Sequence, residues 1–558
     1  MKPNHSVNPR LVKAAFRGYA HPMRSRTKQT AVIGKIFLLG WIIAIIAAVG
    51  VQLACAERSD ARRQAVLIVW DGMRPDFVSE ENTPALWKLS KEGVFFRNHH
   101  AVYPSATEVN GTALATGVYP NHSGLIANYE YRPEIDSRKL INVENPAVVR
   151  RGDELSGGNY IAISTIAEIV QKSGRRTAIA TAKTVGLLFD RHLDSRGKDS
   201  VALFAGESLP PDAIASVVKV LGPFPAPPKQ PFAEGDAWTA KALTDSLWRD
   251  GVPAFSLLWL SEPDATQHQT APGAQAALAA IRTADQNLAH VLAALDRQHA
   301  RETTDIFVVS DHGFSTIKRQ IDLRKILATA GFNVATDDPK PDDIMLVGNG
   351  GTVLFYIIQH DTSVTHRLVE FLQRSDFAGV IFTKEPMPGT FGLDKAKIDS
   401  PNAPDVAMAF RWNDSRNQFG VPGMIDADWN RRAGKGTHAT LGRFDMHNTL
   451  IASGPDFHRG QSDDLPSGNV DLAPTILRIL GITPPRQLDG RILSEAMVNI
   501  DISPSKTETE TIEATRKFSS GTWRQTLQIS HAGSTIYLDE GNGAFVPPRS
   551  ENKNELHH

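Results

Sequence analysis

Three apolar runs constrain the fold of this chain more than any other feature of its sequence. Residues 65–70, 255–260 and 306–310 are predominantly Val, Ile, Leu, Phe and Trp, so each is predicted to be a β-strand buried on both faces. Such strands are typical of a parallel sheet covered by helices, and the carboxyl ends of its strands converge on one crevice. Side chains that bind metals follow these runs: Asp71, Asp264, His268, Asp311 and His312. The sequence therefore predicts an α/β fold that gathers these side chains at one edge of its sheet.

Strand-like and helix-like segments alternate along the chain, as in a mostly parallel sheet with helices on its faces. We expect helices at 108–115, 165–171, 271–297 and 470–480, and strands at 177–182, 304–310 and 448–453. A region from about 319 to 435 has strand- and helix-like segments of its own, and candidate ligands flank it. It is predicted to be an inserted cap over the site, within a catalytic domain spanning residues 57–500. The extension 501–558 has no predicted role, and its polar stretch 503–513 is expected to be a linker.

The N-terminal segment is predicted to direct export. Basic residues but no acidic residue precede Glu57, and an apolar stretch covers residues 36–51. Together with the small-residue site Ala54-Cys55-Ala56, this pattern is typical of a secretory signal peptide cleaved before Glu57. The alternative is an uncleaved anchor with its basic end in the cytoplasm. Residues 1–56 are thus predicted to be a signal peptide or membrane anchor, with the catalytic domain periplasmic, secreted or anchored outside the cytoplasm. Membrane contact is expected only through this segment, if it stays uncleaved.

The composition limits the partners and the metal ligands. The formal net charge is -1 over 558 residues, so no global field indicates a nucleic acid polymer as a partner. Cys55 is the only cysteine, and cleavage before Glu57 would remove it. Asp and His are then left to hold a metal, a donor set that suits zinc, manganese or iron, with zinc favoured in a catalytic centre that keeps open positions.

Several further motifs complete a family resemblance. In chain order the motifs are VWDGMRP at 69–75, YPSAT at 103–107, ATGVYP at 115–120, EPD at 262–264 with His268, SDHG at 310–313, GTH at 436–438 and DLAPTIL at 471–477. In this order they resemble the type I phosphodiesterase/nucleotide pyrophosphatase family of the alkaline phosphatase superfamily. The resemblance covers residues 65 to about 495. It implies an alkaline-phosphatase-like α/β/α sandwich with a mostly parallel central sheet and an inserted cap.

The resemblance also implies a site with two divalent metal ions, for which zinc is favoured. It assigns one ion to Asp264, His268 and His438. It assigns the other ion to Asp71, Asp311, His312 and Thr107. Thr107 would also be the covalent nucleophile, which metal coordination activates, and it would begin a helix whose N–H groups face a phosphate. Asn110, one helical turn further, matches the phosphate-binding asparagine of the family.

Two residues are expected to select the substrate. Lys183 follows the strand at 177–182, and its stretch resembles a substrate-binding segment of phosphonoacetate hydrolases; the second lysine expected there is Val185. A solvent-facing Lys183 is the competing interpretation. Glu108 stands where nucleotide pyrophosphatases have an aromatic residue that packs on a nucleobase, and it cannot stack. It indicates either a cationic group on the substrate or an internal pairing with Lys183 or Arg74.

The sequence as a whole predicts a metal-dependent hydrolase of small phosphate esters that forms a phosphothreonine intermediate. Diester hydrolysis is favoured, because no arginine of the alkaline phosphatase kind follows Thr107. Phosphomonoester and phosphonate hydrolysis are the alternatives. A transferase that moves phosphoryl-linked head groups in the cell envelope is a further alternative, and it would retain the N-terminal anchor.

Overall fold

The computed structural model describes residues 63–192, 199–225, 232–498, 500 and 506–548. The predicted signal peptide or anchor at residues 1–56, with its cleavage site, lies outside these ranges. Among the helices within them, none has both the length and the apolar composition needed to span a bilayer.

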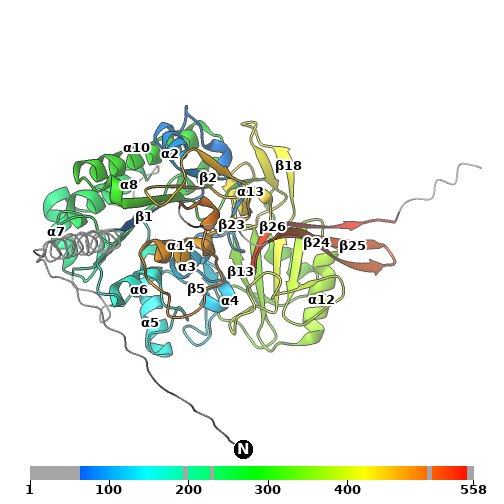
Figure 1. The fold of residues 1–558 in the computed structure, drawn as a ribbon. Helices are drawn as coiled ribbons and strands as arrows, with labels where there is room; N and C mark the ends of the chain where they lie inside the picture. The colour runs from blue at the N-terminus through cyan, green and yellow to red at the C-terminus, as the bar shows by residue number, and fades with distance from the viewer. Residues whose placement is uncertain (1–62, 193–198, 226–231, 499, 501–505, 549–558) are drawn as a thin grey trace, which may run out of the picture. The chain divides into compact units, whose positions relative to one another are not determined.

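The three apolar runs are adjacent strands at the centre of a nine-stranded sheet (Figure 1). Across this sheet the strands are β22 (Gln461–Asp463), β2 (Val94–Phe96), β21 (Leu450–Ser453), β10 (Thr304–Val309), β1 (Gln64–Trp70), β9 (Phe255–Leu260), β6 (Thr177–Thr181), β7 (Val201–Phe204) and β8 (Glu207–Leu209). The five strands from β10 to β7 are parallel, whereas β21 and β8 flank them in antiparallel orientation. The carboxyl ends of β10, β1 and β9 therefore lie at one edge, as predicted.

Helices cover both faces of the sheet because β1 is apolar on both sides. Val66, Ile68 and Trp70 pack with α2 (Pro84–Glu92), α8 (Ala233–Lys241) and α10 (Gln275–Arg297). Ala65, Leu67 and Val69 pack with α3 (Thr107–Thr116), α6 (Ile166–Lys172) and α14 (Leu472–Ile479). Successive residues of a strand point to opposite faces, so one continuous apolar strand serves both layers. The predicted α/β sandwich is confirmed.

The chain between β10 and β21 carries a second, six-stranded sheet. Its strands in order are β12 (Val334–Ala335), β13 (Ile344–Asn349), β14 (Thr352–Ile357), β17 (Val406–Phe410), β15 (Ala378–Thr383) and β16 (Phe391–Gly392). The helices of this segment are α11 (Leu323–Thr329) and α12 (Thr362–Gln373). The chain enters this region through β11 (Ser315–Ile317) and leaves it through β20 (Gly436–Thr437), which pair in antiparallel orientation. With β18 (Trp412–Arg416) and β19 (Pro422–Ile425), these two strands form a small sheet. We call residues 319–435 the cap.

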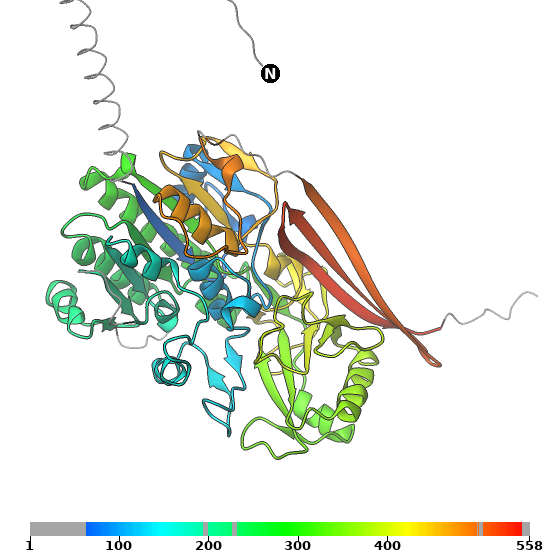
Figure 2. The same ribbon diagram turned by 60° about the horizontal axis from the view of Figure 1, so that its bottom comes forward.

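The C-terminal extension is an antiparallel three-stranded sheet, not a linker followed by short runs. Its strands are β24 (Thr507–Phe518), β25 (Gly521–Ala532) and β26 (Thr535–Val546). The prediction of a linker over 503–513 was wrong for the described part, because residues from Thr507 onward pair along the whole of β25. The sheet packs on the cap through Trp523 and Leu527. Figure 2 shows its long strands, in orange to red, beside the cap. The sheet also contacts the core beside α14, where the Tyr537 hydroxyl donates to Asp471.

The remaining elements are short. The helices are α4 (Pro120–Ser123), α5 (Pro146–Ser156), α7 (Ala213–Leu221), α9 (Asp264–Thr270), α13 (Arg443–Met446), the π-helix η3 (Ala242–Leu247), and the 3-10 turns η1 (Pro75–Phe77), η2 (Thr184–Leu188), η4 (Arg301–Thr303), η5 (Asn469–Asp471) and η6 (Ser494–Ala496). The strands are β3 (His99–His100), β4 (Tyr129–Glu130), β5 (Ile141–Asn142) and β23 (Ser467–Gly468). The helix expected over 271–297 begins only at Gln275. Pro272 lacks an N–H donor and Gly273 has φ +83°, so the chain turns there between α9 and α10.

Candidate active site

The turn after β1 brings two carboxylates together. Asp71 follows the strand, and Gly72 adopts φ +71°, a left-handed conformation that glycine tolerates without strain. A Cβ at position 72 would lie 2.9 Å from the Phe314 ring, so space also demands glycine. The backbone N–H of Gly72 donates to Asp311 Oδ1 at 3.0 Å. The ends of β1 and β10 are thereby fixed against each other.

Helix α9 and the turn after β20 supply a second group. Asp264 begins α9 and His268 lies one turn later, so both face the same way. His268 Nε2 lies 3.1 Å from Asp264 Oδ1, and His438 Nε2 lies 3.6 Å from the same oxygen. Residues that precede the cap in sequence and a residue that follows it thus meet at one carboxylate oxygen.

His312 lies between the two groups. Its Nε2 is 3.3 Å from Asp311 Oδ2 and 3.6 Å from Asp71 Oδ1, and its ring stacks on His438 with centroids 3.7 Å apart. Two sets of side chains in the described ranges have ligand atoms close enough to share an ion: Asp71, Asp311 and His312, and Asp264, His312 and His438. The structure therefore brings together all six Asp and His residues that the sequence proposed as ligands.

The hydrogen bonds of these residues suit a pair of divalent cations. Three buried carboxylate oxygens, namely Asp71 Oδ1, Asp264 Oδ1 and Asp311 Oδ2, have no hydrogen-bond partner in the described chain. These are the oxygens that approach the histidine Nε2 atoms. The Nδ1 atom of each histidine is bonded to a backbone carbonyl, those of Gly436, Gly313 and Ser105 for His268, His312 and His438. Such bonds place the proton on Nδ1 and leave Nε2 free to bind a metal.

Charge in the site is only partly balanced by the protein. Burial, followed by the neighbouring Asp311, raises the pKa of Asp71 well above its usual range. Burial also opposes ionisation of Asp264, but His268 and Lys183 outweigh it and hold the pKa of Asp264 well below its usual range. Buried carboxylates of this kind are stabilised by bound cations.

Lys183 holds the opposite oxygens of the same carboxylates. Its Nζ donates to Asp71 Oδ2 at 2.6 Å and to Asp264 Oδ2 at 3.1 Å, and Trp259 Nε1 also donates to Asp71 Oδ2. Burial disfavours the ammonium, yet Asp264 and Asp71 raise the pKa of Lys183 well above its usual value. Lys183 lines the cleft, but its ammonium joins one carboxylate from each ligand group. The sequence proposed it as a substrate contact, and this geometry instead makes it a positioning residue.

Thr107 lies beside the ligands at the first position of α3. Its Oγ1 is 3.3 Å from His312 Nε2, and the residue is 5% exposed. The preceding loop is fixed by Ser105, whose hydroxyl donates to the carbonyl of Thr440. The hydroxyl proposed as the nucleophile thus faces the ligand groups, at the start of a ten-residue helix.

The assignment of Asn110 to substrate binding requires correction. Its side chain is fully buried, and its amide Nδ2 donates to the carbonyls of Val102, Pro104 and Ala106. Its Oδ1 accepts from the backbone N–H of Val102 and from Asn469. Helical side chains point back toward the N-terminus, so this amide reaches the loop before Thr107 instead of a phosphate in the cleft. Asn110 therefore holds the loop that precedes Thr107.

Asn128 also lines the cleft, and the sequence did not single it out. Its Oδ1 accepts from the backbone N–H of Glu108 at 3.0 Å, which leaves the Nδ2 group as the donor end beside Thr107. Asn128 precedes the two-residue strand β4 and stands far from Thr107 in sequence. No local pattern indicates it, because only tertiary packing brings it to the nucleophile.

A cleft of about 700 Å³ lies between the core and the cap. The core contributes Thr107, Glu108, Asn128, Tyr129, Glu144, Lys183, Asp264, His268 and His438. The cap contributes Thr336, Leu346, Gly348, Asn349, Gly350, Trp429, Asn430 and Arg431. Arg431 reaches the ligand candidates with its guanidinium, whose Nη2 lies 3.4 Å from His268 Nε2. The cap therefore supplies one wall of the space in which a substrate would meet Thr107.

Two acidic side chains line this cleft next to Thr107. Glu108 is 6% exposed, and its Oε2 has no hydrogen-bond partner in the described chain. The same holds for Oε2 of Glu144, which lies in the turn between β5 and α5. Burial, followed by the Glu144 carboxyl, raises the pKa of Glu108 well above its usual range. Burial likewise raises the pKa of Glu144.

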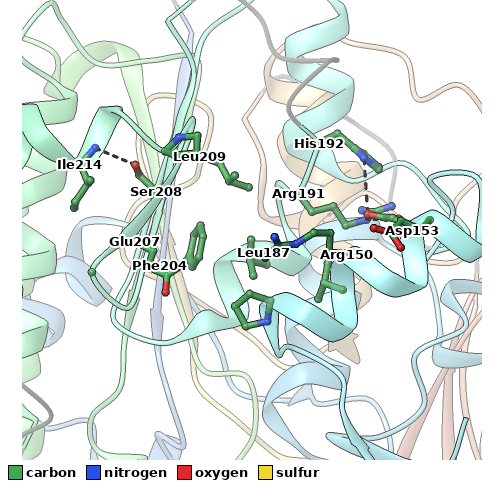
Figure 3. Close-up of a pocket in the computed structure, with 15 residues that line it drawn as sticks. Arg150, Asp153, Leu187, Arg191, His192, Phe204, Glu207, Ser208, Leu209 and Ile214 are labelled. Atoms are coloured by element: carbon green, nitrogen blue, oxygen red, sulfur yellow. Dashed lines mark hydrogen bonds and ion pairs between the residues drawn. The ribbon is translucent and has the colours of Figure 1, made fainter. Parts of the chain in front are cut away.

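A second cavity has a volume of about 620 Å³. Figure 3 shows the side chains that line it. Leu187, Phe204 and Leu209 line it, and Ser208 accepts from the backbone N–H of Ile214. Its most buried charge, Arg191, is already paired with Asp153 and Glu168. None of the six Asp and His ligand candidates lines this cavity.

Known proteins resemble the chain in both sequence and fold. The sequence model of the type I phosphodiesterase/nucleotide pyrophosphatase family matches residues 65–413. A venom phosphodiesterase of Naja atra is 24% identical over 269 residues, which are 47% of this chain but only 27% of that protein. The bis(5'-adenosyl)-triphosphatase enpp4 of Xenopus laevis is 21% identical over 459 residues, 81% of this chain and 84% of that protein.

A solved structure supports the fold. It is murine ectonucleotide pyrophosphatase/phosphodiesterase 5, as an inactive variant in complex with AMP, with a TM-score of 0.53 and 17% identity. The similarity covers 76% of this chain and 96% of that one. The family match spans β1, β9 and β10, helix α3 and most of the cap. The chain belongs to the type I phosphodiesterase/nucleotide pyrophosphatase family.

Proposed function

We propose that this protein is a two-metal phosphodiesterase that acts on small phosphate esters through a phosphothreonine intermediate. The observation that carries the proposal is the convergence of three unpartnered carboxylate oxygens and three histidine Nε2 atoms beside the Thr107 hydroxyl. We assign one cation to Asp264, His268 and His438. We assign the other cation to Asp71, Asp311, His312 and Thr107.

The bound cations would supply the positive charge that acidifies the Thr107 hydroxyl and stabilises the phosphate and leaving oxygens. Thr107 Oγ1 attacks phosphorus in line, the bond to the alcohol breaks, and the phosphoryl group stays on Thr107. Water then attacks the same phosphorus and frees Thr107. Asn128 is placed to donate from Nδ2 to a non-bridging oxygen in both steps. Lys183 keeps one carboxylate of each group oriented toward its ion.

Diesters are the proposed substrate class. A phosphonate hydrolase that used Lys183 to bind a substrate anion would need an ammonium that is instead bonded to Asp71 and Asp264. Arg431 is the cleft cation that could serve a monoester, and its guanidinium already lies against His268. Both observations support diesters ahead of phosphonates and monoesters. A nucleic acid polymer is not a proposed substrate, since the net charge of -1 offers no basic field.

We propose zinc as the metal and export from the cytoplasm as the location. The donors are Asp and His without cysteine, which suits a catalytic zinc site. The relatives include a venom phosphodiesterase and an ectonucleotide pyrophosphatase of Homo sapiens, names that denote extracellular proteins. Cleavage before Glu57 would release the catalytic part, and retention of the segment would anchor it.

The test compares nitrophenyl phosphodiesters and monoesters with the full-length chain supplied with Zn²⁺. We expect faster hydrolysis of the diester, a loss of at least about a thousandfold in Thr107→Ala, and a loss with EDTA that Zn²⁺ reverses. Activity that survives in Thr107→Ala would overturn the covalent mechanism. Preference for the monoester would overturn the diester assignment.

A further inference from the structure

The acidic pair beside Thr107 forms no direct ion pair within the described chain. Neither Glu108 nor Glu144 forms an ion pair with any residue in those ranges, although both line the cleft. Lys183 and Arg74, the two cations that the sequence suggested as partners of Glu108, already bind other groups. Lys183 bonds Asp71 and Asp264, and Arg74 pairs with Asp76 and bonds two backbone carbonyls. Neither Lys183 nor Arg74 therefore forms an ion pair with Glu108, although the charge of Lys183 favours ionisation of both carboxyls.

An unpartnered carboxylate this deeply buried is costly unless something binds it. Glu108 is 6% exposed. Neither its Oε2 nor that of Glu144 has a hydrogen-bond partner in the described chain. Two such carboxylates near each other repel when both are ionised, and a positive group placed between them relieves that repulsion. The aromatic rings of Tyr129 and Trp429 line the same cleft and offer faces that attract cations.

The position of Glu108 identifies the part of the substrate that it meets. In an in-line displacement the leaving group departs on the side opposite the nucleophile. The retained ester arm lies to the side of the line that joins the attacking and leaving oxygens, and it stays beside Thr107 through both steps. Glu108 follows Thr107 on α3 and lines the same cleft, so we place it next to this retained arm. A carboxylate accepts hydrogen bonds from a primary ammonium and so selects an aminoalkyl arm over a neutral one.

We propose that Glu108 and Glu144 form a subsite for a positively charged amine on the retained ester arm. The substrate class is then a phosphodiester with an aminoalkyl arm. This inference rests on the proposed phosphodiesterase function, because it names the substrate of that same site.

The first experiment compares two nitrophenyl phosphodiesters that share the leaving group and differ in the retained arm, aminoethyl or hydroxyethyl. We expect wild-type kcat/KM to favour the aminoethyl diester by about tenfold, the value of one charged hydrogen bond. Glu108→Gln is expected to bring this ratio close to one. Glu154→Gln removes an equal charge from an exposed position of α5 and should keep the ratio. A wild-type ratio of one or less, or a ratio unchanged in Glu108→Gln, would overturn the subsite.

A binding measurement separates the subsite from the reaction. Calorimetry on Thr107→Ala with Zn²⁺ compares aminoethylphosphonate with ethylphosphonate, and we expect about tenfold tighter binding of the amine. Equal affinities would refute the subsite even if diesters are hydrolysed. Preferential binding of the amine without turnover of either diester would refute the proposed function and support the subsite.

Discussion

A buried histidine next to the active-site loops should make folding sensitive to mild acid. His99 is 1% exposed in the two-residue strand β3. Its Nε2 lies 3.0 Å from Asn469 Oδ1, an acceptor, so Nε2 carries the proton. Its Nδ1 lies 3.0 Å from Ser467 Oγ and accepts the hydroxyl proton. Both nitrogens of the neutral ring are therefore hydrogen-bonded. A second proton, on Nδ1, would remove the hydrogen bond that Nδ1 accepts from the Ser467 hydroxyl.

The size and sign of the effect follow from proton linkage. Burial, above all, lowers the pKa of His99 from 6.5 to about 3. Below about pH 6.5, His99 binds a proton in the unfolded chain but stays neutral in the native protein. The free energy of unfolding therefore falls as the pH drops from about 6.5 toward 3. Each pH unit in this window is worth about 1.4 kcal/mol, which gives about 2 kcal/mol at about pH 5.

The assay compares the free energy of unfolding of wild type and His99→Gln in denaturant, at about pH 7.5 and about pH 5, with EDTA present throughout. Gln cannot titrate, so the deficit of the variant should shrink by about 2 kcal/mol at the lower pH. Other titrating groups cancel in the difference if they are independent of position 99. His366→Gln, at an exposed position of α12, should show no such change. A deficit of His99→Gln that is the same at both pH values would refute the reasoning.

Three more predictions follow from the site and its supports. Asn128→Ala should lower kcat/KM on a diester by about a hundredfold with little change in melting temperature, whereas Asn110→Ala should lower the free energy of unfolding by about 2–4 kcal/mol, because it strips a buried hydrogen-bond network. Removal of divalent metal with EDTA should lower the melting temperature, and Zn²⁺ at about a hundred times its Kd should restore about 2.7 kcal/mol of stability. Trp523→Ala should cost about 3–5 kcal/mol in denaturant unfolding, because the indole is fully buried against the cap and its Nε1 donates to Gly389.

The core of the fold was predictable because apolar runs have a strong local signature. β1, β9 and β10 stand out as continuous apolar segments, and their parallel order fixes where the ligand candidates lie. The C-terminal sheet lacked this signature. β24 is largely exposed and its residues alternate Thr and Glu, so its sequence resembles a solvated linker. Only pairing with β25 makes it a strand, and that partner cannot be recognised locally.

The candidate ligands were predictable for the same reason, whereas the cleft walls were not. Asp71 and Asp311 follow strands whose ends must meet. Asn128 and Glu144 lie between α4 and α5, in a region with only two short strands, and tertiary packing brings them beside Thr107. Asn110 misled the sequence argument because a residue one turn after Thr107 lies near it in sequence. The direction of its side chain depends on the loop at 102–106, which the sequence does not reveal.

Reaction chemistry and substrate choice therefore reside in different parts of the molecule. The proposed ligands lie at strand ends and on the short helix α9, and backbone carbonyls orient each of their histidines, so little in this group can vary without loss of the proposed site. Glu108 and Glu144 reach the same cleft from helix α3 and from the turn before α5, outside that fixed group. An acidic residue directly after Thr107 leaves the ligand geometry intact and changes the charge that meets the retained ester arm. We infer that position 108 can be exchanged to alter the substrate while the reaction stays the same. The glutamate that replaces the aromatic residue of nucleotide pyrophosphatases at this position therefore concerns the substrate, whereas the proposed ligands concern the chemistry.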